Sequence, residues 1–168
     1  MLWVAAMMAA MIGLSPMTVG ASEIQEQTIS IAFVNPQYPK TLRVEAEALA
    51  ADVNAERARH GVPALVRDAT LDRFAHAKAT EMAARGYFGH TDPDGVTFQD
   101  RLRAWHWPVA YASENIAFDR DEKHAHAAFM NSPPHARNLL DRNERRIGVA
   151  VVTVGERETF YVEGFSAN

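Results

Sequence analysis

Histidine is the residue type in this chain best suited to chemistry, because a neutral imidazole binds metals and titrates near neutral pH. His90 follows the stretch GYFG, where a helical pattern gives way to a turn, and His135 follows two prolines in NSPPHARNLL. Glu114 begins ENI in a strand-like run, where a carboxylate is costly unless it is paired. These three residues are the candidate site, although long stretches of sequence separate them.

Other arrangements that support catalysis are not found in the sequence. His124 and His126 are two residues apart on a predicted helix, so their side chains diverge by roughly 200°, whereas helical metal pairs are three or four residues apart. Cysteine is absent, and so are the patterns H-E-x-x-H and G-x-S-x-G. No nucleophile with an attendant base is therefore predicted.

Two long helices are predicted before the candidate site. Residues 44–61 have an apolar stripe at helical spacing, and Gly61 fits the stop position. Residues 67–88 contain a second stripe, which Asp68 can cap and Gly86 can end. The stripes comprise Ala46, Leu49, Ala50 and Val53 in the first helix and Leu71, Phe74, Ala75, Ala79 and Met82 in the second.

Two shorter helices have recognisable starts. Thr97 and Asp100 form a variant of the capping box. Ser132 can cap a helix with its hydroxyl, and Pro133 suits the first helical position, where a missing N–H costs nothing. This places His135 in the first turn of a helix on a stiff backbone.

The remaining pattern predicts strands. Residues 112–118 form a short strand, and the β-rich runs IGVAVVTVG and RETFYVEGF form a hairpin at Gly155–Glu156. The order of helices, strand, helices and two strands indicates an α+β domain with an antiparallel sheet of about three strands covered by helices.

The N-terminus predicts export. Residues 1–21 carry no charge, their apolar run is too short to span a membrane, and Val19 and Ala21 fit signal-peptidase cleavage. We expect a signal peptide cleaved near Ala21, a linker or edge strand at 22–43, and one domain at 44–168, secreted or periplasmic without a transmembrane anchor. The usual Lys or Arg of a signal peptide is missing, and the alternative is an uncleaved N-terminal anchor.

The net charge of −4 and the absence of a Lys/Arg stripe with interleaved aromatic residues argue against nucleic acid as a partner.

Five stretches in order, YFGHTDPDG, SENIAF, NSPPHARNLL, RIGVAVV and YVEGF, resemble the CAP superfamily (cysteine-rich secretory, antigen 5 and pathogenesis-related 1 proteins), most of all its bacterial SCP-like extracellular branch. The resemblance runs from about Val44 to Ser166. It implies an α–β–α sandwich with a central antiparallel sheet flanked by helices.

The resemblance also implies a cleft lined by two histidines and two acidic residues. His90, Glu114 and His135 match three of these. The second acid has no match, because the corresponding stretch FMNS leaves Asn131 or Ser132 there. Ala136 separates the second histidine from Arg137, whereas the bacterial branch usually has arginine directly after it.

Two imidazoles and one carboxylate suit zinc or another divalent metal with an open position for water. The alternative is a hydrogen-bonded cluster that braces the cleft. We expect a secreted, non-enzymatic binding module whose ligand is a lipid, glycan, cell-envelope component or protein. The alternatives are a metal-dependent hydrolase acting on peptide or envelope material and an assembly module with an idle cleft. Four aromatic residues, Tyr87, Phe88, Trp105 and Trp107, could contact a ligand or pack in the core.

Overall fold

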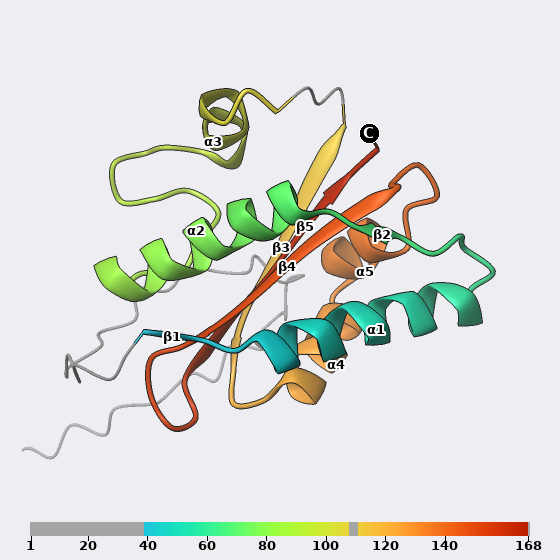
Figure 1. Ribbon diagram of the computed structural model, residues 1–168, viewed down its shortest axis with the longest axis horizontal. Coiled ribbons are helices and arrows are strands. Elements are labelled where there is room, and N and C mark those ends of the chain that lie inside the picture. Colours follow the sequence, from blue (N-terminus) through green and yellow to red (C-terminus); the bar gives the residue numbers. More distant parts are fainter. Residues whose placement is uncertain (1–38, 108–110, 168) are drawn as a thin grey trace, which may run out of the picture.

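A β-sheet between two layers of helices forms the framework of the computed structural model, which describes residues 39–107 and 111–167 (Figure 1). Its three long strands are antiparallel, as predicted, in the order β4-β5-β3. They comprise β3 (Ala112–Asp119), β4 (Arg146–Thr153) and β5 (Thr159–Ser166). The hairpin predicted between the last two is confirmed, and Val154 N donates to Glu158 O across its turn at 2.8 Å.

Two additional two-residue strands, β1 (Lys40–Thr41) and β2 (Val66–Arg67), pair with the outer edge of β4. β1 is antiparallel to β4 and lies in the range for which a linker or edge strand was expected. β2 is parallel to β4, which departs from the purely antiparallel sheet of the prediction. So short a pair has no alternating pattern that sequence could reveal.

Helices cover both faces of the sheet, which gives the predicted α–β–α arrangement (Figure 1). Alternate residues of β4 serve the two faces: Val149 and Val151 pack toward α1, α4 and α5, whereas Ala150 and Val152 pack toward α2. The helices are α1 (Arg43–Arg59), α2 (Ala69–Arg85), α3 (Phe98–Ala104), α4 (Glu122–Asn131) and α5 (Pro133–Leu139).

Helix α2 begins and ends where its local signals predict. The Asp68 carboxylate accepts hydrogen bonds from the backbone N–H groups of Thr70 and Leu71, at 2.8 and 3.1 Å. Gly86 ends the helix in the left-handed region with φ of 65°. The helix lies directly on β4 at Gly148, where an added Cβ would be 2.1 Å from the Leu71 carbonyl carbon.

The two shorter predicted starts have different outcomes. The capping box of α3 is confirmed, because Thr97 and Asp100 each accept a hydrogen bond from the other's backbone N–H. The predicted side-chain cap of α5 is wrong, since the Ser132 hydroxyl makes no capping bond. Pro133 and Pro134 occupy the first two helical positions and have no N–H, which leaves the His135 N–H as the only donor within usual reach of the cap.

The predicted signal peptide and most of the 22–43 segment lie outside the described residues. In the part of the chain that is described, none of the helices has the length and hydrophobicity needed to cross a bilayer.

Candidate functional site

Glu114 lies on β3 on the face covered by α2 and α3, and its side chain is only 1% exposed. It is in register with Gly164 of β5, which in turn pairs with Gly148 of β4. Its charge is compensated: Arg101 Nη2 is 3.0 Å from both carboxylate oxygens. His90 Nδ1 donates to Glu114 Oε1 at 2.9 Å. The structure therefore joins two of the predicted residues directly.

The loop that carries His90 is held by two cations that sequence reasoning missed. Arg101 Nη1 donates to the His90 carbonyl oxygen at 2.7 Å, and Lys78 Nζ donates to the same oxygen at 3.3 Å and to the Tyr87 hydroxyl at 3.0 Å. Burial, with the nearby charge of Arg101, lowers the pKa of Lys78 to about 8. Both cations bond the His90 carbonyl oxygen, and Glu114 bonds the ring nitrogen Nδ1. The imidazole is therefore oriented before any ligand binds.

A hollow of about 370 Å³ opens beside this cluster. The His90 side chain is 43% exposed there, so the ring edge away from Glu114 faces solvent. Most of the other lining side chains carry hydroxyl or amide groups. The lining comprises His90, Thr91, Thr97, Phe98, Gln99, Ala112, Ser113 and Glu114.

His135 is half-buried in the first turn of α5 and is not among the residues that line the hollow. Its ring lies edge-on to Phe129, with ring centroids 5.4 Å apart. Burial lowers the pKa of His135, and the positive charge of His90 lowers it further. The two imidazoles therefore lie within range of each other's charge, although His90 alone bonds Glu114.

A second polar network lies on the opposite face of β3 and reaches α5. Asn115 Nδ2 donates to the His135 carbonyl oxygen at 3.2 Å and to Glu163 Oε2 at 3.0 Å. Asn138 Nδ2 donates to Asn115 Oδ1 at 2.9 Å. Glu163 is fully buried, and burial raises the pKa of its carboxyl to about 8. This network ties the backbone of the His135 turn to the sheet.

The arrangement does not fit a metal held by all three predicted residues. Within residues 39–107 and 111–167, no three His, Asp or Glu side chains are grouped closely enough to hold an ion. Both Glu114 oxygens accept from Arg101, and His90 Nδ1 is bound to Glu114, which leaves Nε2 as the free nitrogen of that ring. Zinc binding by His90, Glu114 and His135 stays a prediction, and it needs the three side chains to come closer together than they lie in the described structure.

The aromatic residues near the site mainly build the core. Tyr87 is buried, and Phe88 stacks on Phe160 with ring centroids 6.5 Å apart. Trp105 lies edge-on to Phe74 at 5.5 Å, and Trp107 Nε1 donates to the Ser166 hydroxyl at 3.3 Å.

The missed cations have a sequence signal in hindsight. Arg101 is three residues from Phe98 and next to Leu102, the buried residues of α3. Lys78 lies between Phe74 and Met82 on the buried stripe of α2. A cation on the apolar face of a helix needs a buried partner, and both have one here.

Comparison with known proteins agrees with this fold. The model of the cysteine-rich secretory protein (CAP) family matches residues 50–165. The chain is 35% identical over 103 residues to YkwD of Bacillus subtilis, covering 61% of this chain and 40% of that protein. It is 30% identical over 99 residues to the membrane protein YlbC of the same organism, covering 58% of this chain and 29% of YlbC.

Solved structures extend the likeness. An extracellular SCP-domain protein of Bacillus anthracis superposes with a TM-score of 0.65 at 29% identity, over 74% of this chain and 40% of that one. An outer surface protein of Borrelia burgdorferi superposes with a TM-score of 0.70 at 19% identity, over 77% of this chain and 98% of that one. At this identity the likeness shows the fold alone. The family model spans more than half of the sequence, so this chain belongs to the cysteine-rich secretory protein (CAP) family.

Proposed function

We propose that this chain is an exported, non-enzymatic binding domain that holds a polar glycan of the cell envelope in the hollow beside His90. The observation that carries the proposal is the fixed contact of His90 with Glu114, backed by Arg101. It presents a half-exposed imidazole edge at a set position, which suits a ligand hydroxyl as hydrogen-bond partner.

The polar lining favours a glycan over a lipid. Thr91 and Gln99 add a hydroxyl and an amide to the wall, whereas the Thr97 hydroxyl bonds Asp100 and the Ser113 hydroxyl bonds Glu144. A ligand rich in hydroxyl groups can replace the water on His90, Thr91 and Gln99, whereas an acyl chain would leave these three polar side chains without that partner.

Binding rather than catalysis fits the hydrogen bonds around the two histidines. Across the residues that the structure describes, neither His90 nor His135 bonds a serine or threonine hydroxyl, so no hydroxyl nucleophile is activated by these rings. Export is supported by the uncharged apolar N-terminus and by the extracellular SCP-domain protein to which the chain is similar.

The test is calorimetric titration with soluble peptidoglycan fragments. The wild type should bind, and His90→Ala should weaken binding by about tenfold, the loss of one hydrogen bond to the ligand. His60→Ala, an exposed histidine at the end of α1, is the matched control and should bind as the wild type does. No binding by the wild type at millimolar fragment, or equal weakening in both variants, would contradict the proposal.

The alternative, a metal-dependent hydrolase, draws support from the nearness of His90 to His135, whose pKa the His90 charge lowers after burial. It predicts zinc binding at micromolar concentration that is lost in His135→Ala and falls steeply below about pH 6, where imidazole protonates. Zinc uptake of this kind, with cleavage of the fragments, would replace the binding proposal.

A further inference from the structure

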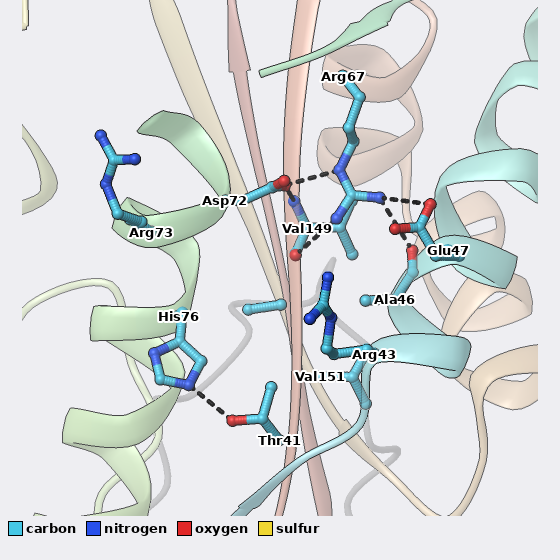
Figure 2. A pocket seen from close by; sticks show the side chains of 11 residues that line it. Thr41, Arg43, Ala46, Glu47, Arg67, Asp72, Arg73, His76, Val149 and Val151 are labelled. Atoms are coloured by element: carbon cyan, nitrogen blue, oxygen red, sulfur yellow. Dashed lines mark hydrogen bonds and ion pairs between the residues drawn. The ribbon is translucent and has the colours of Figure 1, made fainter. Parts of the chain in front are cut away.

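A second hollow, with no residue in common with the first, lies between α1 and α2 at the outer edge of β4 (Figure 2). Its volume is about 460 Å³, within the range of small-molecule sites. At one end Thr41 Oγ1 and His76 Nε2 are hydrogen-bonded at 2.7 Å, which joins β1 to α2. Buried aliphatic residues of β4, Val149 to Val151, form its base.

The backbone hydrogen-bonding groups of Val149, on the open edge of β4 at the base of this hollow, already have side-chain partners. β1 and β2 pair with the two ends of β4 and leave its middle without a strand partner on this side. There the Val149 N–H donates to Asp72 Oδ1 at 2.9 Å, and the Val149 carbonyl accepts from Arg67 Nη2 at 3.1 Å. These side chains occupy the backbone groups that an added peptide strand would need, so the hollow is unsuited to strand addition.

The charges around the hollow leave a positive excess. Arg67 takes up both carboxylates, with Nε 2.6 Å from Asp72 Oδ1 and Nη1 3.6 Å from Glu47 Oε2. Arg43 and Arg73 are therefore not compensated by an acid of the lining. Arg73 extends away from the hollow and donates to the Thr70 hydroxyl at 3.0 Å (Figure 2).

Arg43 is the cation that faces the hollow. Figure 2 shows its guanidinium directed into the space between α1 and β4. No hydrogen bond or ion pair to any residue of 39–107 or 111–167 occupies it. A guanidinium in this setting presents a planar fork of donors that matches a carboxylate or a phosphate.

We propose that this hollow binds a small organic anion, a carboxylate or a phosphate monoester, whose charged group pairs with Arg43. The volume exceeds what an inorganic ion fills, and the base and the arginine stems offer apolar surface to the body of the ligand. This hollow shares no lining residue with the His90 hollow, so the anion proposal can be tested separately from the glycan proposal.

The test is a titration of the folded chain with phenyl phosphate and with 3-phenylpropanoate, followed by calorimetry and by amide NMR shifts at Val149 and Val151. Arg43→Gln should weaken binding by about tenfold or more, since the lost bond is charge-assisted. Arg43→Lys should retain part of the affinity, because the charge remains and the fork does not. Glu47→Gln should strengthen binding, since a nearby negative charge is removed.

Arg73→Gln is the matched control, an equally charged residue of the rim whose guanidinium extends away, and it should weaken binding much less than Arg43→Gln does. Binding of only one probe supports the site and identifies its anionic group. Three results would overturn the proposal: no binding at millimolar probe, equal weakening in Arg43→Gln and Arg73→Gln, or equal binding of the neutral analogue 3-phenylpropanol. Arg43 is exposed, so its variants should keep the wild-type circular dichroism spectrum.

Discussion

Replacing Glu163 by glutamine should make the protein more stable in neutral and alkaline solution. The Glu163 side chain is fully buried on β5, one carboxyl oxygen accepts from Asn115, and the other has no partner in the described structure. Burial raises the pKa of this carboxyl from 4.5 to about 8. The folded protein therefore keeps a proton that the unfolded chain has already released at pH 7.

The size and sign of the effect follow from this difference. Below pH 4.5 both states are protonated and the carboxyl costs nothing. From there to about pH 8 the free energy of unfolding falls by about 1.4 kcal/mol per pH unit. Above pH 8 this decrease in stability stays constant. The full difference is about 5 kcal/mol on this scale, a large part of the stability of an ordinary domain. The glutamine side chain of the Glu163→Gln variant is neutral throughout and should remove the loss.

Urea unfolding at pH 4, 6 and 8 measures this directly. Glu163→Gln should match the wild type near pH 4 and exceed it increasingly toward pH 8. Glu156→Gln, which removes the same charge from an exposed position in the hairpin turn, should follow the wild type at every pH. If the wild type and Glu163→Gln lose stability in parallel as the pH rises, Glu163 is ionised in the folded protein and the reasoning is refuted.

Two further substitutions test the packing around the candidate site. Arg101→Met should lower the free energy of unfolding by about 3–5 kcal/mol, because it leaves the buried Glu114 carboxylate without its cation. The double variant with Glu114→Gln should recover part of this loss. Urea unfolding measures both variants, and an unchanged midpoint for Arg101→Met would contradict the ion pair. Gly148→Ala should cost about 3 kcal/mol or more, since its Cβ would meet the Leu71 backbone at 2.1 Å; a wild-type melting temperature would show that α2 does not lie against β4 at this point.

The elements with local signals were predictable. Asp68, the pair Thr97–Asp100 and Gly86 act within one turn of their own helix, so their types and spacing determine the outcome. The two β-rich runs joined at Gly155–Glu156 likewise predict the hairpin. Ser132 had the right residue type but makes no side-chain cap, and Pro134 removes one of the two N–H groups, those of the second and third helical positions, that its hydroxyl could have bound.

The partners of the candidate site were not predictable in the same way. Arg101 meets Glu114, and Lys78 meets the His90 carbonyl, only once α2, α3 and β3 have packed together. The spacing of these residues along the chain carries no information about such contacts. Sequence reasoning therefore identified His90 and Glu114 as candidate site residues. It missed Arg101 and Lys78, the cations that bond the Glu114 carboxylate and the His90 carbonyl.

The alternation of β3 explains why the two histidines have different surroundings. Neighbouring residues of a strand point to opposite faces, so Glu114 faces α2 and α3 while Asn115 faces α4 and α5. His90 joins the first face through its ring, and His135 joins the second through its backbone carbonyl. β3 is also the edge strand of the sheet, so His90 and His135 lie on either side of an open edge. A ligand that contacted both rings would have to span that edge, and a ligand confined to the His90 hollow would not contact His135. Fragment binding that is sensitive to His90→Ala and insensitive to His135→Ala would place the ligand on the first face.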